Sequence, residues 1–322
     1  MASRQTGIEI SEGTPMHFFL MVLTICLFTA PAYAVSVTEL RFQSAGVERR
    51  AILVNEAPQG EVRPVVIVLH GGRGSAEEMR HRTGFDDLAV AQGFSLVFAE
   101  GTQWGQGRHA WNTGYLQRRQ VGRSDDIAYF DALIDLLIAR HRADVSRIYM
   151  TGGSNGAMMT FVYATRRAER LAAIAPIVGA MFSFETRPRV PVPIMIINGA
   201  MDSEVPLEGG FSRNPIVARA QAAPFKSLEE SLQFWVAVNR SQPQPQIDVS
   251  GTVTTRSYAA SDGGAVTVSI VDAVGGHGWP GSPTVRPGNK PIQAIRGADR
   301  VWEFFRTQRR TVSEANGRSL GP

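Results

Sequence analysis

A serine between glycines is the clearest candidate nucleophile in this sequence. Ser154 lies in residues 152–156, Gly-Gly-Ser-Asn-Gly, which fit the pattern Gly-x-Ser-x-Gly. A short apolar run before it predicts a strand and residues 157–164 predict a helix, so we expect the serine at a tight turn where larger neighbours would collide. The amide of Asn155, at the start of that helix, would face an oxyanion formed on a bound carbonyl.

A serine hydroxyl is a poor nucleophile at neutral pH and needs a base that is held by a carboxylate. Of the six histidines, His70 and His277 follow predicted buried strands, where parallel sheets form their ligand sites. His277 follows the last predicted strand in a glycine-rich loop, and we expect it to be the base. His70 is expected to be structural, because it precedes Gly71 and Gly72, a turn of the type that offers amides to an oxyanion.

The carboxylate is expected between the serine and the histidine in chain order, at the end of a strand. Asp202 meets both conditions, and Glu204 is the second choice. Asp272 lies too close to His277 along the same strand to reach its side chain easily. The pair at 125–126 fits a helix N-cap better than a catalytic role.

The elements that would position these residues alternate between strand and helix. This order predicts an α/β fold with a mostly parallel central sheet and helices on both faces. Residues 100–122 are expected to form a long loop and residues 203–225 a loop or lid. The predicted strands are 40–42, 51–54, 65–69, 95–99, 148–150, 171–178, 194–197, 253–258 and 266–271, and the helices are a stretch ending near residue 92 and residues 125–141, 228–238 and 292–305.

Composition bounds the class of protein. The chain has 322 residues, of which 43% are hydrophobic, and a formal net charge of +4. This is long enough for one large globular domain. We find no basic stripe interleaved with aromatic residues, so binding to nucleic acid is not expected.

Residues 1–34 have the pattern of a secretory signal peptide. An apolar stretch over residues 18–30 is too short to span a bilayer, and the Ala-Tyr-Ala of residues 32–34 supplies a cleavage pattern. Translation could start at Met1 or at Met16. The single cysteine, Cys26, lies inside this stretch. We therefore expect a secreted or periplasmic protein without a stable membrane anchor after cleavage, a catalytic domain over 35–310 and a disordered tail over 311–322.

Several motifs together resemble the secreted α/β-hydrolase esterases that include polyhydroxybutyrate depolymerases and feruloyl or acetylxylan esterases. The resemblance extends from Val65 to the last predicted helix. One departure is Asn198-Gly199, where the family usually has His-Gly. The motifs are Leu69-His70-Gly71-Gly72, Trp111-Asn112, Ser124-Asp125-Asp126, Gly153-Ser154-Asn155-Gly156, Asn198-Gly199-Ala200-Met201-Asp202-Ser203-Glu204-Val205-Pro206 and Gly276-His277-Gly278-Trp279-Pro280-Gly281.

The resemblance implies an ester hydrolase that forms an acyl-enzyme on Ser154, with Asp202 as acid and His277 as base. No cofactor or metal is implied. The expected substrate is a hydroxyalkanoate ester of the polyhydroxybutyrate type, and the alternative is a feruloyl or acetylxylan ester of a polysaccharide. Candidate substrate contacts are Trp279 and the pair Trp111-Asn112, with core packing as the alternative for each.

Two further functions stay open from the sequence. The same three residues would also serve a peptidase or an acyltransferase. A non-catalytic secreted binding protein that retains the hydrolase fold is the alternative from another class.

Overall fold

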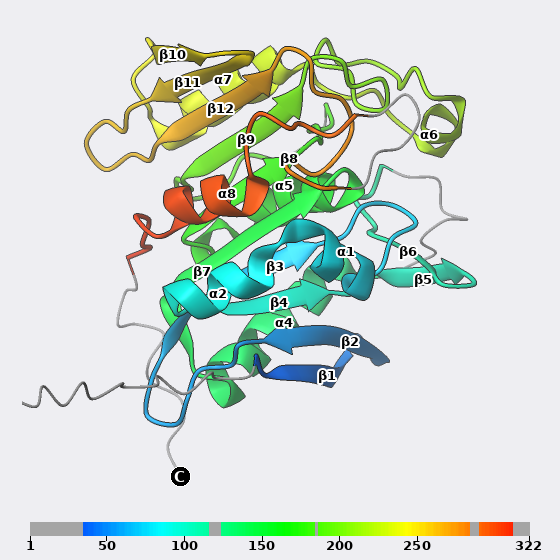
Figure 1. Cartoon of the computed structure of the whole chain (residues 1–322), viewed down its shortest axis with the longest axis vertical. Coiled ribbons are helices and arrows are strands. Elements are labelled where there is room, and N and C mark those ends of the chain that lie inside the picture. Colours follow the sequence, from blue (N-terminus) through cyan, green and yellow to red (C-terminus); the bar gives the residue numbers. More distant parts are fainter. Residues whose placement is uncertain (1–34, 116–123, 184–185, 284–289, 312–322) are drawn as a thin grey trace, which may run out of the picture. The chain divides into compact units, whose positions relative to one another are not determined.

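A computed structural model describes residues 35–115, 124–183, 186–283 and 290–311. The chain divides between Ala34 and Val35, and all described residues belong to the second unit. That unit is built on a ten-stranded sheet with the order β1-β2-β4-β3-β7-β8-β9-β12-β11-β10 (Figure 1). Its strands are β1 (Val37–Ser44), β2 (Val47–Val54), β3 (Arg63–Leu69), β4 (Ser95–Ala99), β7 (Ala143–Gly153), β8 (Ala173–Ile177), β9 (Ile194–Gly199), β10 (Gln246–Ser250), β11 (Val253–Tyr258) and β12 (Thr267–Asp272).

The six strands at the centre of the sheet are parallel, and antiparallel strands flank them on both sides. Strand β3 is buried from Pro64 to Leu69, as its continuous apolar run predicts. Because side chains alternate along a strand, Ile67 packs into one hydrophobic core and Val68 into the other. The sheet therefore separates two cores.

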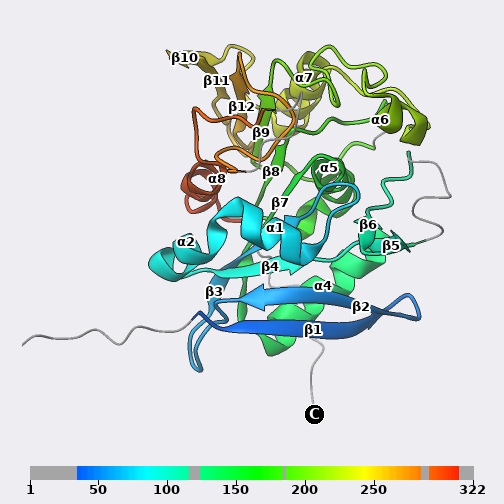
Figure 2. The same ribbon diagram turned by 45° about the vertical axis from the view of Figure 1, so that its right-hand side comes forward.

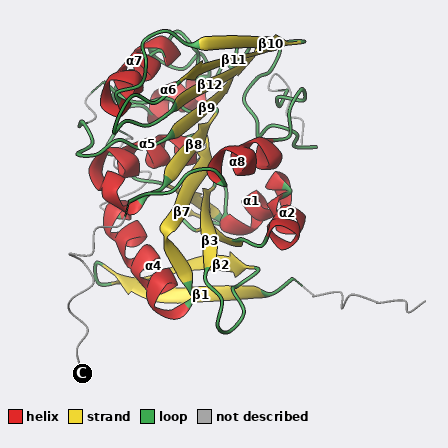
Figure 3. Ribbon diagram, turned by 90° about the vertical axis from the view of Figure 1, so that its left-hand side faces the viewer, coloured by secondary structure: helices red, strands yellow, loops and turns green. Residues whose placement is uncertain are grey.

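Helices cover both faces of the sheet (Figures 2 and 3). The residues of α4, α5 and α7 pack into the core on one face, and those of α1, α2 and α8 pack into the core on the other. The helices are α1 (Ala76–Thr83), α2 (Phe85–Gln92), α4 (Asp126–Arg140), α5 (Asn155–Arg167), α6 (Pro215–Ala220), α7 (Leu228–Asn239) and α8 (Gly297–Phe305), with a 3₁₀ turn at Ala168–Arg170.

The predicted fold class is confirmed, two local predictions are wrong, and one strand was missed. The expected loop over 100–122 contains a hairpin of β5 (Thr102–Gly105) and β6 (Arg108–Ala110). Strand β10 was not predicted, because all five of its residues are exposed and give no burial pattern. Helix α8 begins at Gly297 rather than at Ile292.

The segment 203–225 has little regular structure and includes the short helix α6. No helix among the described residues is both long and apolar enough to cross a membrane.

Candidate active site

Ser154 lies in the turn between β7 and α5, with φ 55° and ψ −119°. Left-handed φ values are uncommon for a residue other than glycine, and the sharp turn exposes the side chain above the sheet. The two outer glycines of the motif are required by close approaches. A Cβ on Gly152 would lie 2.8 Å from the Cβ of Leu69, and one on Gly156 would lie 2.5 Å from the carbonyl oxygen of His70.

Three side chains from separate strand ends meet at this turn. The Nε2 atom of His277, in the loop after β12, lies 2.9 Å from Ser154 Oγ. Its Nδ1 atom lies 2.7 Å from Oδ2 of Asp202, in the loop after β9. Both distances are within hydrogen-bond range, and the order matches a nucleophile, a base and an orienting carboxylate. The structure thus brings together the three residues that the sequence predicts for catalysis.

The carboxylate of Asp202 is held in place by its own loop. Its Oδ1 atom accepts hydrogen bonds of 2.8 Å from the amides of Glu204 and Val205, which leaves Oδ2 to face the imidazole. The side chain is fully buried, so water does not compete for these contacts. Glu204, the second choice from the sequence, lies on the other side of the ring, with Oε2 3.3 Å from Nε2 of His277. Of the two carboxylates, Asp202 is the one placed at Nδ1.

Gly71 and Gly72 lie against the serine turn, as an oxyanion-binding role requires. A Cβ on Gly71 would lie 3.4 Å from Cβ of Ser154, and one on Gly72 would lie 3.6 Å from Cβ of Asn155. The carbonyl oxygen of Gly71 is bound by the amide of Gly74 at 3.1 Å and by Nδ1 of His70 at 2.8 Å. In the planar trans peptide between Gly71 and Gly72, the C=O and the N–H point in opposite directions. The two hydrogen bonds to the Gly71 carbonyl therefore also fix the direction of the Gly72 N–H.

The tautomer of His70 follows from its partners. Its Nε2 atom accepts a hydrogen bond of 3.0 Å from the amide of Gly101, so Nδ1 carries the proton and donates to Gly71. Burial lowers the pKa of this imidazole to about 4, which keeps the ring neutral at ordinary pH. His70 is therefore a neutral connector between two loops, as expected of a structural residue.

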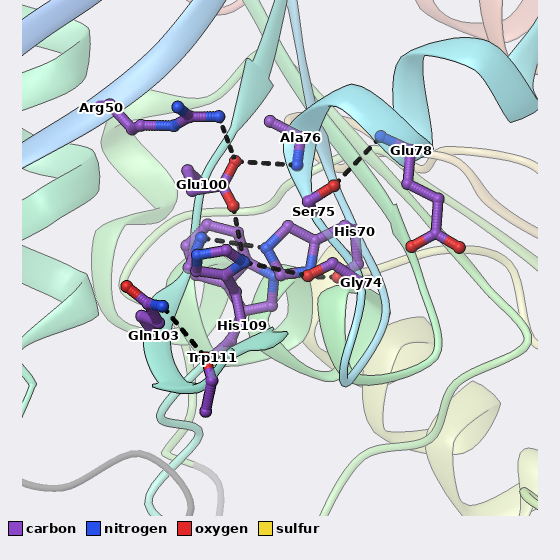
Figure 4. A network of polar contacts seen from close by, with 12 residues as sticks. Arg50, His70, Gly74, Ser75, Ala76, Glu78, Glu100, Gln103, His109 and Trp111 are labelled. Atoms are coloured by element: carbon purple, nitrogen blue, oxygen red, sulfur yellow. Dashed lines mark hydrogen bonds and ion pairs between the residues drawn. The ribbon is translucent and has the colours of Figure 1, made fainter. Parts of the chain in front are cut away.

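A polar network connects the segment after His70 with Glu100 and His109 (Figure 4). Glu100 accepts a hydrogen bond of 2.9 Å from the amide of Ala76, the first residue of α1, and lies 2.8 Å from Nδ1 of His109. Burial opposes ionisation of Glu100, but His109 and the Ala76 amide outweigh it and lower the pKa of the carboxyl group. The ionised carboxylate therefore joins α1 to the β5–β6 hairpin.

The side chain of Asn155 supports the turn from below. Its Oδ1 atom accepts from the amide of Trp111 at 2.8 Å, and its Nδ2 atom donates to the Trp111 carbonyl at 3.2 Å. This pair fixes the first residue of α5, whose backbone N–H has no acceptor inside the helix. The amide of Asn155 remains a candidate oxyanion donor.

A cleft surrounds Ser154, and Trp279 borders it while two other predicted substrate contacts do not. Trp111 is fully buried, packs against the ring of His70 and donates from Nε1 to the His70 carbonyl. Asn112 binds the carbonyl of Ser124 and does not border the cleft. We correct both expectations, since Trp111 is buried against His70 and Asn112 is bonded to Ser124 and Asp126. The cleft is lined by His70, Gly71, Gly72, Gly74, Ser75, Glu78, Met79, Arg82, Gly153, Ser154, Val178, Glu204, His277, Gly278, Trp279 and Ser282.

Sequence reasoning missed several of these lining residues. Met79 and Val178 bring apolar side chains to the cleft, and Glu78 and Arg82 bring an ion pair. The only local signal is Ser75, which caps α1 by accepting a hydrogen bond from the amide of Glu78. That signal predicts a helix start but not which face borders the cleft. No group of three or more histidine, cysteine or acidic residues suited to a metal ion occurs in the described part of the chain.

Known proteins are similar to this chain in sequence and in fold. The family model for esterase PHB depolymerase matches residues 51–205. The putative esterase NocK of Nocardia uniformis subsp. tsuyamanensis is 30% identical over 236 residues, which cover 70% of this chain and 67% of NocK. The bifunctional acetylxylan esterase/xylanase XynS20E of Neocallimastix patriciarum is 26% identical over 153 residues, 47% of this chain and 21% of that protein.

A solved structure, the acetyl xylan esterase from Aspergillus awamori, superposes with a TM-score of 0.57 at 14% identity and covers 84% of this chain and 98% of its own. Fold and relatives together define the protein as an α/β-hydrolase and a serine esterase. The chain belongs to the esterase PHB depolymerase family. The resemblance seen in the sequence is confirmed.

Proposed function

We propose that this esterase hydrolyses its substrate through an acyl-enzyme on Ser154, with His277 as general base and Asp202 as the carboxylate that orients it. The observation that carries the proposal is the continuous hydrogen-bonded path from Asp202 through His277 to Ser154 Oγ. Three residues that lie far apart in the chain converge within hydrogen-bond distance at the mouth of one cleft.

In the first step, Ser154 Oγ attacks the ester carbonyl while Nε2 of His277 takes its proton. Asp202 holds the Nδ1–H and stabilises the imidazolium that forms. The negative charge on the substrate oxygen is stabilised by the amide of Asn155 and by those of Gly71 or Gly72. The imidazolium then gives its proton to the leaving alcohol.

In the second step, water attacks the acyl-enzyme carbonyl and His277 takes a proton from that water. As the second tetrahedral intermediate collapses, the His277 imidazolium gives its proton to Ser154 Oγ, and the acid leaves. The same amides bind the oxyanion in both steps, so the site works without any rearrangement of the glycine turn.

The proposed substrates are hydroxyalkanoate esters of the polyhydroxybutyrate type, in line with the family description. Acetylated polysaccharide is the second candidate. It is supported by the names of two similar proteins, the acetylxylan esterases of Neocallimastix and Aspergillus, and by the charged residues Glu78, Arg82 and Glu204 in the cleft wall. Charged side chains of this kind can bind hydroxyl groups of a sugar.

Hydrolysis of short-chain nitrophenyl esters tests the mechanism. We expect Ser154→Ala and His277→Gln to lower kcat by about 10⁴-fold or more, while both variants keep the wild-type melting temperature. Comparable rates of ester hydrolysis by the wild type and by Ser154→Ala would refute the proposal. Rates on hydroxybutyrate oligomers, acetylated xylan and feruloyl esters then rank the substrates.

Export is part of the proposal. It is supported by the apolar stretch at 18–30 and the small residues at 32–34. We expect protein isolated from the periplasm or the medium to begin at Val35 by N-terminal sequencing. A cytosolic protein that still begins at Met1 or Met16 would contradict this.

A further inference from the structure

We propose that Val178 is a specificity-determining residue whose side chain closes the acyl pocket beside Ser154 and restricts the enzyme to short acyl groups. This inference rests on the proposed function, because it assumes that the acyl group is transferred to Ser154. It names the acyl class that the family match leaves open.

The backbone at Val178 has an unusual conformation. Its φ angle is +44°, in the left-handed region that a β-branched residue rarely adopts. The surroundings impose this turn. The amide of Val178 donates to the carbonyl of Ile197 at 2.7 Å, and a Cβ on the following Gly179 would collide with the Cβ of Ala157 in α5. The chain must therefore leave β8 sharply to pass over the start of α5.

The turn places Val178 next to the nucleophile. The amide of Ser154 donates to the carbonyl of Ile177 at 3.0 Å, so the two segments run side by side up to the reacting serine. Val178 lines the cleft, and only 2% of it is exposed. It belongs to the same apolar cluster as Met79 and Trp279, which also line the cleft.

These three side chains form the apolar part of the cleft wall. A Cβ on Gly153 would lie 3.8 Å from both Met79 Cε and Trp279 Cε3, so these two side chains flank the residue before the nucleophile. The wall also includes three charged side chains, Glu78, Arg82 and Glu204. An acyl chain would bury its carbons against the apolar part, and the alcohol would face the charged part.

The presence of valine rather than glycine at position 178 supports the inference. Glycine adopts a left-handed φ without strain, so a turn that served only the backbone would favour glycine at position 178. Valine keeps the turn strained, and strain of this kind occurs where a side chain has a function. The whole cleft that Val178 helps to line measures about 110 Å³, less than the pockets that typically bind drug-sized ligands.

The experiment compares Val178→Gly and Val178→Ala with the wild type on nitrophenyl acetate, butyrate and hexanoate. Shortening the side chain opens the wall, so the ratio of kcat/KM for hexanoate to that for acetate should rise by about tenfold or more. Val178→Thr has the same shape and should keep the wild-type ratio. Val178→Ile should lower the ratio of kcat/KM for butyrate to that for acetate. This variant tests the role of the side chain even if the smaller variants do not fold.

A ratio that stays within about twofold of the wild type in every folded variant would overturn the inference, whatever the stability. Melting temperatures separate the two contributions of the side chain. Val178→Gly should melt about 2–4 °C above Val178→Ala, because only glycine relieves the left-handed strain. A wild type that hydrolyses none of the esters would refute the proposed function, whereas an active enzyme with unchanged ratios would refute only the role of Val178.

Discussion

Two histidines follow two strands of the same sheet, yet their surroundings give them different chemistry. His277 follows β12 and lies between a buried carboxylate on Nδ1 and the hydroxyl of Ser154 on Nε2. His70 follows β3, is 1% exposed, and has backbone partners on both ring nitrogens, the carbonyl of Gly71 and the amide of Gly101.

The difference shows which surroundings allow an imidazole to act as a base at this edge of the sheet. A ring that is buried away from water gains a proton readily only where a negative charge compensates it, and Asp202 lies at Nδ1 of His277 to supply that charge. His70 has no carboxylate on either ring nitrogen, and burial lowers its pKa to about 4. One ring is arranged to gain and lose a proton, and the other is arranged to keep its tautomer and hold a loop.

The comparison predicts that Asp202→Asn makes His277 resemble His70. An amide on Nδ1 cannot stabilise the imidazolium and can bind the wrong tautomer, so kcat should fall by about 10⁴-fold. KM for nitrophenyl acetate should change little, because Asp202 does not line the cleft. Steady-state kinetics of wild type and variant measure both effects.

Glu204→Gln is the matched control for that variant. Glu204 lies at Nε2 rather than at Nδ1, so losing its charge should lower kcat by no more than about tenfold. If Glu204→Gln were as inactive as Asp202→Asn, the second carboxylate would share the orienting role. If Asp202→Asn kept more than a tenth of the activity, Asp202 would not be the orienting carboxylate.

Much of the fold could be predicted from the sequence, because buried strands carry a strong pattern. The run from Val65 to Leu69 is apolar throughout and pairs with β4 and β7 as a central strand must. Strand β10 carries no such signal, since its residues are exposed and only pairing with β11 makes them a strand. Edge strands depend on their neighbours more than on their own residues.

The residues of the proposed catalytic site were predictable for a different reason. Each lies at a turn that demands particular residues, such as the glycines around Ser154 and the Asp202 loop that caps its own carboxylate with two amides. The supporting residues were not predictable in this way. Trp111 is an aromatic residue in a glycine-rich segment, which fits a substrate contact as well as the buried support that the structure reveals. Nothing local to the sequence distinguishes these two uses.

His70 should affect catalysis indirectly, through the Gly71 carbonyl. Loss of one oxyanion donor typically costs 10²- to 10³-fold in kcat, and a loosened donor should cost less. We therefore expect His70→Gln to lower kcat by about 10- to 100-fold with KM nearly constant. Asparagine can place an amide nitrogen near the former Nδ1 and still donate to Gly71, so His70→Asn should recover most of the loss. Equal activity of these two variants would contradict the positioning role and leave only a packing role.

The smallest predicted effect concerns stability rather than rate. Above pH 6.5 the neutral form of His70 is present in both the folded and the unfolded chain. As the pH falls from 6.5 to about 4, the unfolded chain gains a proton on this residue and the folded chain does not. The free energy of unfolding should therefore fall over this interval by an amount on the order of 3 kcal/mol that His70 alone contributes. Carboxyl groups such as Glu100 lose their contributions to stability at lower pH in wild type and variant alike.

Urea denaturation in steps from pH 4 to pH 7.5 measures this effect. The free energy of unfolding of the wild type should differ from that of His70→Asn most above pH 6.5, and the difference should shrink toward pH 4. Two curves that stay parallel over the whole interval would mean that His70 takes up a proton as readily in the folded chain as in the unfolded one, and the contrast with His277 would then lie in contacts alone.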